Sequence, residues 1–515
     1  MRREQMRTEP TGTSLPVLAE QTWSRYGDQL VTVFEGERWS ADRLAERSWR
    51  FAGGLTRLGL RPGDRLVVCM ANCLEVGISY HAGWRAGAVV TPVLFLLTET
   101  ELAHVLVDSQ ARLIVTTPEF LPKVVAAAAN APELRAIVVA GDIPDPGATP
   151  VPVLPFAELA DAEPAPLVDT DPSGLAALLY TGGTTGRAKG VMLSHDALSA
   201  AGWSATMTGI DEQMQSSLLP LPLAHVYGLM VSTMQLHMSQ PMTSVLMRWF
   251  DPASWLALAQ AERVNTSPVV PTMLRLLLQH PLEDYDLSAL RRLTSGSAPL
   301  PAEVRLEWNR RQPHIEIVEG YGCTETAAII SSCPLDVQRA GSVGLPAPIA
   351  EVGIDTGEGP AQAADVDGEI CVRGPMLLSG YWGDTEPAVV DGWFHTGDVG
   401  RLDADGFLYI VDRIKDVIIR DGFNVYPRDI EEALLTHPAV LNCAVIGRPD
   451  ERHGEVPVAF VELRPGAGVS TDELREYAKS QVSAAKYPRE IRIVDQVPLT
   501  SVGKVDRKRL RTLAD

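Results

Sequence analysis

The sequence predicts an α/β protein with a large N-terminal body of several subdomains and mostly parallel sheets, followed by a small α+β domain. Strand-like apolar runs such as RLVVCM and ARLIVTT alternate with helical segments in the N-terminal part, which is the pattern of parallel sheets covered by helices. The C-terminal part instead combines short strands with single helices. The 515 residues also exceed what one hydrophobic core usually organises.

The first helix with clear signals follows Ser40. Ser40 is placed to cap the helix, and Leu44, Phe51 and Leu55 recur at the spacing of one helical face. The run RLVVCM that comes next predicts a buried strand. Residues 124–173 are rich in Ala, Pro and Asp, so we expect one strand and long surface connections there.

Turn and cap signals predict the C-terminal domain. IIRDGFNVYP is typical of a strand and a turn, and Pro427 fits the first turn of the helix that follows. Ser470 and Glu473 have the spacing of a capping box for a second helix. We place the boundary between an N-terminal domain of residues 1–412 and a C-terminal domain of residues 413–515.

Composition excludes several classes of partner. The net charge of −20 argues against nucleic acid and against an anionic membrane surface. No secretory signal is indicated, and no uninterrupted run of about 18 apolar residues predicts a membrane span. The six cysteines are scattered without a CxxC pair or a compact zinc-like Cys/His cluster. We therefore expect a cytoplasmic protein with reduced thiols.

Residues 178–190, LLYTGGTTGRAKG, form a glycine-rich segment after an apolar strand. Glycines and hydroxyls let backbone N–H groups approach phosphate oxygens, and Lys189 supplies positive charge. The same composition also fits a flexible turn without a ligand. Lys189 precedes Gly190 rather than Ser or Thr, so the usual NTPase loop and its hydrolysis are disfavoured.

The segment resembles the phosphate-binding motif of the adenylate-forming superfamily, which includes acyl-CoA synthetases, luciferases and the adenylation domains of peptide synthetases. Other motifs of that family follow in the family's order: PLAHVYG (222–228), SGSAPLP (295–301), EGYGCTE (319–325), GWFHTGDVG (392–400), DRIKDVIIRDGFNVYP (412–427) and PLTSVGKVDRKRLR (498–511). The resemblance covers nearly the whole chain. It implies an ATP-dependent ligase that activates a carboxylic acid as an acyl-adenylate and transfers the acyl group to coenzyme A, with a mobile C-terminal domain.

The resemblance also implies a nucleotide site. Tyr321 is expected to pack on adenine, and Thr324 to contact the α-phosphate. Glu325 is expected to hold Mg²⁺ with Thr181, because a hard cation prefers oxygen ligands. The full set expected to bind the nucleotide is Thr181, Gly182, Gly183, Thr184, Thr185, Gly186, Lys189, Gly296, Ser297, Ala298, Glu319, Tyr321, Gly322, Thr324, Asp398, Arg413 and Lys504.

Four charged residues, one just before the C-terminal domain and three within it, receive roles from the same resemblance. Asp398 is expected to accept hydrogen bonds from the ribose, and Arg413 is expected to assist at the ribose or the phosphate. Lys504 is expected to reach both the carboxylate of the acid and the α-phosphate, which stabilises charge during adenylation. Lys415 occupies the hinge position of the family.

The acyl pocket is expected at residues 225–228. Amino-acid-activating relatives usually place an Asp where Val226 stands, and aryl-acid relatives often place an Asn there. His225 and Tyr227 flank Val226, and Gly228 is expected to leave space, so an apolar acid without an α-amino group fits. A fatty acid is the first choice and an aryl acid the second. The expected catalytic set is Lys504, Thr324, Glu325 and His225.

Two other functions remain open. One is a stand-alone adenylating enzyme that loads an aryl or fatty acid onto the phosphopantetheine of a carrier protein. Residues 340–360 contain no evident insertion that would hinder thioester formation, so coenzyme A remains the expected acceptor. The other is a non-catalytic nucleotide sensor, which the presence of Lys504 argues against, since a pure binder has no need of it.

Overall fold

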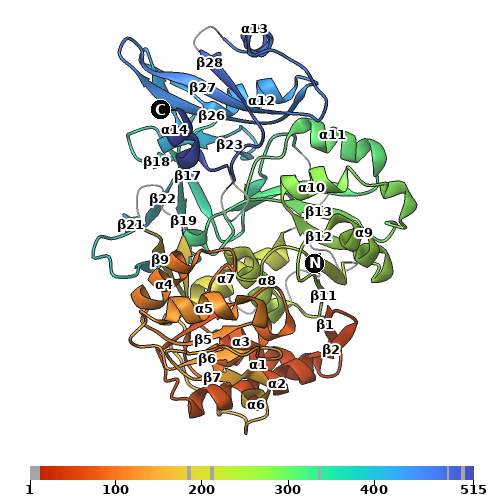
Figure 1. The fold of residues 1–515 in the computed structure, drawn as a ribbon, viewed down its shortest axis with the longest axis vertical. Helices are drawn as coiled ribbons and strands as arrows, with labels where there is room; N and C mark the ends of the chain where they lie inside the picture. Colours follow the sequence, from red (N-terminus) through yellow and green to blue (C-terminus); the bar gives the residue numbers. More distant parts are fainter. Residues whose placement is uncertain are drawn as a thin grey trace.

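The computed structural model describes the following residues of the chain: 12–181, 187–208, 214–334, 337, 339–483, 486–499 and 505–514. Figure 1 shows a large body with the smaller C-terminal domain, in blue, at the top of the view. Among the described residues, no helix combines the length and the apolar character needed to span a membrane.

The first large sheet has eight strands, in the order β20 (Gly380–Tyr381), β9 (Lys189–Ser194), β8 (Leu175–Thr181), β4 (Val89–Pro92), β3 (Arg65–Cys69), β5 (Ala111–Thr116), β6 (Ala136–Val139) and β7 (Val153–Pro155). From β8 to β7 all neighbouring strands are parallel. β9 and β20 add antiparallel strands at one edge. The predicted strands at RLVVCM and ARLIVTT are confirmed as β3 and β5.

The second large sheet has nine strands, in the order β16 (Leu345–Pro346), β15 (Ser331–Ser332), β14 (Glu316–Tyr321), β13 (Arg292–Ser295), β12 (Thr266–Val269), β10 (Ser216–Leu219), β11 (Thr243–Leu246), β1 (Leu30–Phe34) and β2 (Glu37–Ser40). Its central strands, from β14 to β1, are parallel. The carboxyl ends of β13 and β14 therefore lie at the same edge of the sheet.

The helices of the body are α1 (Leu15–Tyr26), α2 (Ala41–Arg57), α3 (Leu74–Arg85), α4 (Glu99–Asp108), α5 (Leu121–Ala128), α6 (Phe156–Ala160), α7 (His195–Met207), α8 (Val226–Met234), α9 (Pro252–Ala261), α10 (Pro271–Leu277) and α11 (Ala302–Arg311). In α2 the Ser40 hydroxyl accepts a hydrogen bond from the Arg43 N–H, and Leu44, Phe51 and Leu55 are buried, as predicted. Residues 124–173 hold two strands, β6 and β7, rather than one.

The body contains a third, smaller sheet. It is antiparallel and contains β18 (Pro360–Ala361), β17 (Glu351–Asp355), β19 (Gly368–Arg373), β22 (Trp393–Leu402), β21 (Val389–Val390) and, paired with β22, β23 (Leu408–Arg413). Because β23 leads directly into the C-terminal domain, this sheet connects the body to that domain (Figure 1).

The C-terminal domain has its own sheet and helices: β24 (Ile418–Arg420), β25 (Phe423–Val425), α12 (Pro427–Leu435), β26 (Val440–Asp450), β27 (Gly454–Leu463), α13 (Thr471–Gln481), β28 (Glu490–Val494) and α14 (Arg507–Ala514). Pro427 begins α12, and the Ser470 hydroxyl accepts a hydrogen bond from the Glu473 N–H at the start of α13. Ile418, Val461 and Leu474 are buried in a core that belongs to this domain. The predicted fold class is therefore confirmed.

Candidate nucleotide and acyl site

The candidate nucleotide residues gather at the carboxyl ends of β13 and β14. Ser295 at the end of β13 lies opposite Glu319 in β14, so the loop that starts at Gly296 runs beside residues 319–321. A Cβ added at Gly296 would lie 3.5 Å from the Gly320 carbonyl oxygen. Ligands of open α/β sheets bind at this kind of edge, outside the carboxyl ends of the strands.

Tyr321, Asp398 and Arg413 form one hydrogen-bonded group. The Tyr321 hydroxyl donates to Asp398 Oδ2 at 2.6 Å, and Arg413 Nε lies 3.0 Å from Asp398 Oδ1. Asp398 in β22 and Arg413 in β23 are opposite each other in register. Burial and the charge of Asp398 raise the pKa of Tyr321, so its hydroxyl stays a donor at neutral pH. The fold thus joins three residues that the sequence separates widely.

Glu319 is bound by protein groups on both carboxylate oxygens. Arg305 Nη2 donates to Oε1 at 2.6 Å, and the Leu300 N–H donates to Oε2 at 3.2 Å. The Glu319 side chain is 9% exposed. Its carboxylate therefore fixes the loop of residues 296–300 to strand β14.

We expect Arg305→Met to lower the free energy of unfolding by about 3 kcal/mol, because it leaves the buried Glu319 charge unpaired. Arg310 on the same helix pairs with Glu307 at the surface, so Arg310→Met should leave stability close to that of the wild type. Urea unfolding of both variants measures the difference. Equal stability of the two variants would show that the Arg305 contact does not hold the loop.

The turn after β14 is strained. A Cβ added at Gly322 would lie 2.1 Å from the Ala328 carbonyl oxygen, so no side chain fits there. Ala327 and Ala328 have φ angles of 48° and 85°, in the left-handed region that favours glycine. Each such residue costs of order 1 kcal/mol or more and persists where the surroundings enforce it. The 3-10 turn Thr324–Thr326 lies between Gly322 and the two left-handed residues Ala327 and Ala328.

Glu325 contacts strand β20, which sequence reasoning did not connect to the site. The Tyr381 hydroxyl donates to Glu325 Oε1 at 3.2 Å. Lys189 Nζ lies 2.6 Å from Asp384 Oδ2, just beyond β20. The available signal was the GYWGD segment, residues 380–384, with two aromatic residues between glycines. The pairing of β20 with β9 brings this segment to Glu325 and Lys189.

The remaining phosphate-loop residues are placed only in part. Thr181 ends β8 and lies opposite Lys189 in β9. The candidate residues that lie outside the described part of the chain are Gly182, Gly183, Thr184, Thr185, Gly186 and Lys504. On either side of residues 500–504, Leu499 and Val505 pair with each other in the C-terminal domain.

The predicted acyl residues surround the start of α8. His225 caps this helix, and its Nδ1 accepts a hydrogen bond from the Tyr227 N–H at 3.3 Å. Val226 is buried in the main core of the body, and burial raises the pKa of Tyr227 to about 12. One expectation is wrong: Gly228 does not leave space, since an added Cβ would lie 2.5 Å from the Leu223 Cα. Gly228 instead lets the backbone at Leu223 pack against α8.

Lys415 lies in the 3-10 turn Ile414–Asp416 between β23 and β24. Burial and nearby Arg413 lower its pKa. The neighbouring Asp416 is buried and lies 2.9 Å from Arg511 Nη2 in α14. This turn therefore connects the body to the C-terminal domain through one short segment, and the ion pair anchors the turn to α14 of the C-terminal domain.

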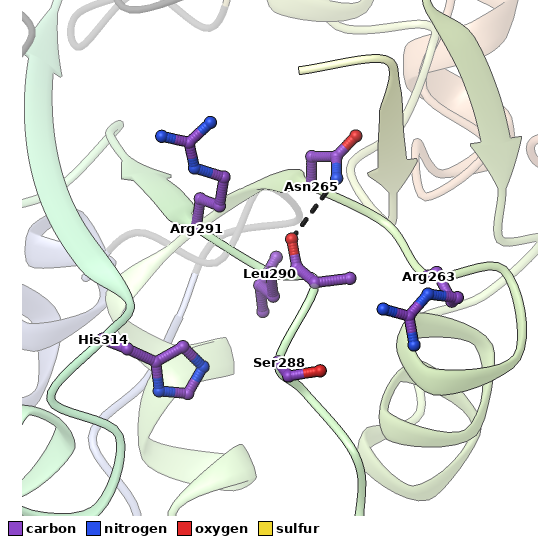
Figure 2. A pocket seen from close by; sticks show the side chains of 7 residues that line it. Arg263, Asn265, Ser288, Leu290, Arg291 and His314 are labelled. Carbon is purple, nitrogen blue, oxygen red and sulfur yellow. Dashed lines mark hydrogen bonds between the residues drawn. The ribbon is translucent and has the colours of Figure 1, made fainter. Parts of the chain in front are cut away.

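A separate hollow of about 500 Å³ lies at the opposite edge of the nine-stranded sheet (Figure 2). Its lining includes Asn265, Arg291 and His314, which come just before β12, β13 and β14, respectively. Asn265 Nδ2 donates to the Ala289 carbonyl oxygen, which closes one side. Because this edge carries the amino ends of the strands, the hollow does not belong to the candidate nucleotide site.

Comparison with known proteins identifies the family. The family described as "AMP-binding enzyme" matches residues 19–382, and "AMP-binding enzyme C-terminal domain" matches residues 429–504. A long-chain-fatty-acid–CoA ligase of Bacillus subtilis (strain 168) is 34% identical, over 97% of this chain and 94% of that protein. A feruloyl-CoA synthase of Amycolatopsis sp is 35% identical, over 95% of this chain and 94% of that protein.

The fold agrees with these matches. The crystal structure of the anthranilate CoA ligase AuaEII in complex with anthranoyl-AMP has a TM-score of 0.89 and 25% identity, over 98% of each chain. The fold and the site define an AMP-binding enzyme. The chain belongs to the adenylate-forming superfamily, in its acyl-CoA ligase branch. It is an acid–thiol ligase of a family that uses ATP, Mg²⁺ and coenzyme A.

Proposed function

We propose that this ligase activates an apolar carboxylic acid, with a fatty acid as first choice and an aryl acid as second, and transfers the acyl group to coenzyme A. The observation that carries the proposal is the group of Tyr321, Asp398 and Arg413 at the carboxyl ends of β13 and β14. A buried carboxylate with a neighbouring guanidinium and phenol suits a ribose next to an adenine. The buried apolar Val226 supports an acid without an α-ammonium group.

The nucleotide roles in this proposal are those that the family resemblance implies. Tyr321 offers its ring to adenine while its hydroxyl holds Asp398. Thr324 approaches the α-phosphate from the strained turn. Lys189, in an exposed ion pair with Asp384, is available for phosphate because such pairs are weak and readily exchanged.

Uncharged residues complete the proposed nucleotide site and acyl pocket. Gly296, Ser297 and Ala298 line the adenine side, where Ser297 adopts a left-handed φ of 68°. The glycines and threonines of residues 182–186 approach phosphate through their backbone and hydroxyl groups. His225, Val226 and Tyr227 form the wall of the acyl pocket.

The residues present fit a magnesium site. Glu325 supplies a carboxylate and Thr181 a hydroxyl, and the turn that carries Glu325 is tied to β20, next to β9, which pairs with the end of β8. Few protein ligands suffice, because Mg²⁺ is usually held by one or two carboxylates together with substrate phosphates and water. Bound there, the ion would neutralise phosphate charge as pyrophosphate leaves.

We expect exhaustive chelation to abolish pyrophosphate release and added Mg²⁺ to restore it. Glu325→Gln should raise the Mg²⁺ concentration needed for half-maximal activity by roughly tenfold or more, since the number of charged ligands sets affinity. Glu307→Gln on the surface of α11 is the matched control. Undiminished activity after chelation, or an equal Mg²⁺ requirement in both variants, would remove Glu325 from the metal site.

We place the boundary between the two domains at residues 412 and 413, where β23 ends at the turn that contains Lys415. Arg275 of the body donates to the Leu441 carbonyl oxygen of the C-terminal domain at 3.3 Å, a contact that rotation of the domain would break. In our proposal Lys504 enters the site for adenylation and leaves it for thioester formation, with Lys415 at the hinge.

The proposal also covers the acceptor of the acyl group and the cellular location of the enzyme. Free coenzyme A is preferred over a carrier protein, although both present the same phosphopantetheine thiol. The six cysteines are all unpaired thiols, which supports a cytoplasmic enzyme. The second candidate, loading of a carrier protein, shares every residue discussed above.

A pyrophosphate-release screen over acids of varied chain length and aromaticity tests the proposal. Product analysis with coenzyme A and with a phosphopantetheinylated carrier protein identifies the acceptor. Saturated fatty acids should be the best substrates, and their 2-amino derivatives should be poor. Preference for aryl acids would select the second substrate class, and transfer to the carrier alone would replace coenzyme A. Release of no pyrophosphate with any acid would favour a nucleotide sensor.

A further inference from the structure

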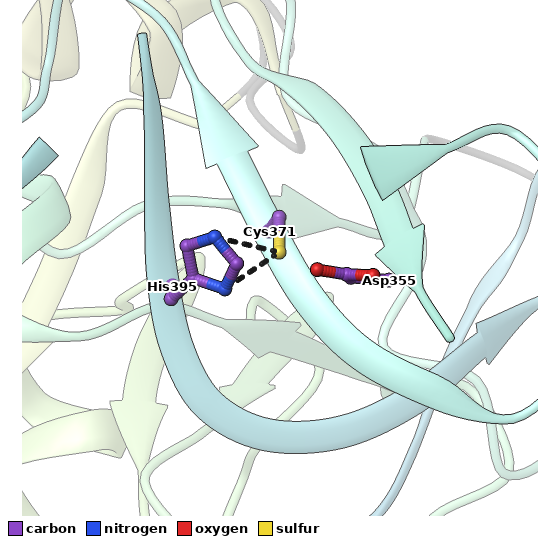
Figure 3. A group of neighbouring side chains, drawn as sticks. All are labelled: Asp355, Cys371 and His395. Carbon is purple, nitrogen blue, oxygen red and sulfur yellow. Dashed lines mark hydrogen bonds between the residues drawn. The ribbon is translucent and has the colours of Figure 1, made fainter. Parts of the chain in front are cut away.

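Three neighbouring strands of the third sheet bring together side chains that the sequence keeps apart. Cys371 in β19 lies opposite His395 in β22, and Asp355 in β17 lies opposite Glu369 in β19. Since side chains alternate between the faces of a strand, Glu369 and Cys371 point to the same face. Asp355, Cys371 and His395 converge there (Figure 3).

The distances suit a shared metal ion. One ligand atom from each of Asp355, Cys371 and His395 lies within 4.8 Å of the other two. Cys371 Sγ lies 3.4 Å from His395 Nδ1 and 4.0 Å from Nε2. Sulfur and nitrogen ligands of one tetrahedral zinc ion are about 3.6 Å apart. Small side-chain rotations therefore bring all three groups to bonding distance of one ion.

A second layer of contacts orients these groups. Glu369 Oε2 lies 2.8 Å from His395 Nδ1, and Glu369 Oε1 accepts the Gly397 N–H at 3.0 Å. With its proton on Nδ1, His395 keeps Nε2 for an ion, which is the usual carboxylate–histidine arrangement at metal sites. Asp355 Oδ1 accepts the N–H groups of Gly357 and Gly359, which fixes that carboxylate as well.

The charge of the cluster favours a cation. Across the described residues, neither Asp355 nor Glu369 forms an ion pair with a Lys or Arg. Thiol, imidazole and carboxylate together are typical ligands of zinc, whereas Mg²⁺ prefers oxygen alone. The site therefore differs in chemistry from the magnesium site proposed at Glu325, which lies in the 3-10 turn after β14 and not in the third sheet.

We infer that Asp355, Cys371 and His395 form a binding site for a zinc-type divalent cation, with Glu369 as the outer-shell partner of His395. On binding, the Cys371 thiol gives its proton to solvent as the sulfur–metal bond forms. The ion cross-links β17, β19 and β22. It thereby braces the strand that carries Asp398, three residues after His395.

Titration of metal-free, full-length protein with Zn²⁺ in excess Mg²⁺, without ATP, tests the inference. The wild type should bind one tightly held Zn²⁺, and its thermal midpoint should rise. Co²⁺ should give the charge-transfer band of a cobalt–thiolate bond. Cys371→Ser should lose the band and the rise, and Glu369→Gln should weaken binding by about 10- to 100-fold.

His453→Gln is the matched control, because His453 Nδ1 pairs with Asp421 at the same 2.8 Å in the C-terminal domain. This variant should bind Zn²⁺ as the wild type does. Circular dichroism of each variant verifies that it is folded. Absence of the Co²⁺ band in the wild type, or equal Zn²⁺ binding by wild type and Cys371→Ser, would overturn the proposed site.

Discussion

Lys504→Ala should slow acyl-adenylate formation by about 10²- to 10³-fold, the effect of removing one preorganised group that stabilises transition-state charge. The same variant should convert supplied acyl-adenylate to acyl-CoA at a rate close to that of the wild type. The reason is that Lys504 is proposed to contact the acid and the α-phosphate only in the adenylating arrangement. Pyrophosphate release measures the first step, and thioester formation from synthetic acyl-adenylate measures the second.

Lys508→Ala is the control for this experiment. Lys508 is an exposed lysine of α14, four residues from Lys504, and it makes no proposed contact with substrate. Its replacement should leave both steps unchanged. If Lys504→Ala slowed both steps equally, or left the first intact, the assigned role of Lys504 and the alternation between two arrangements would both be wrong.

Local patterns predicted much of the fold. Helix α2 could be located from its cap at Ser40 and its apolar face, because both signals lie within a few turns of one helix. Strands β3 and β5 of the eight-stranded sheet followed from the apolar runs RLVVCM and ARLIVTT. The strands of residues 124–173 were harder to predict. Strand β7 is short and only partly buried, so its residues show no alternation of buried and exposed positions.

Site residues could be predicted from the sequence where they belong to a motif. They could not be predicted where only the pairing of strands brings them into contact. Tyr321 and Asp398 were grouped by resemblance, and their 2.6 Å contact follows from the fold. No local signal links Cys371 to His395, because the contact arises from the pairing of β19 with β22. The expectation for Gly228 was wrong for a related reason. A glycine indicates that another group approaches the backbone closely, but the sequence does not say whether that group is a ligand or another part of the backbone.

Lys415→Pro should slow transfer of the acyl group to coenzyme A by about 10²-fold, the scale of effect caused by small misplacement of reacting groups, while sparing pyrophosphate release. Lys415 is the second residue of a 3-10 turn, where a backbone N–H has no partner within the turn, so proline fits there. Its ring then fixes φ and resists the backbone change that rotates the C-terminal domain. Rapid mixing of enzyme-bound acyl-adenylate with coenzyme A measures the transfer step directly.

The control for Lys415→Pro is Lys415→Ala, which removes the side-chain charge but leaves φ free. If hinge motion is what matters, Lys415→Ala should transfer the acyl group nearly as fast as the wild type. Urea unfolding of both variants separates a loss of motion from a loss of structure, because the buried Asp416 carboxylate, paired with Arg511, adjoins the turn. Equal slowing by proline and alanine would assign the effect to the lysine charge, and slowing of pyrophosphate release alone would place the hinge elsewhere in the chain.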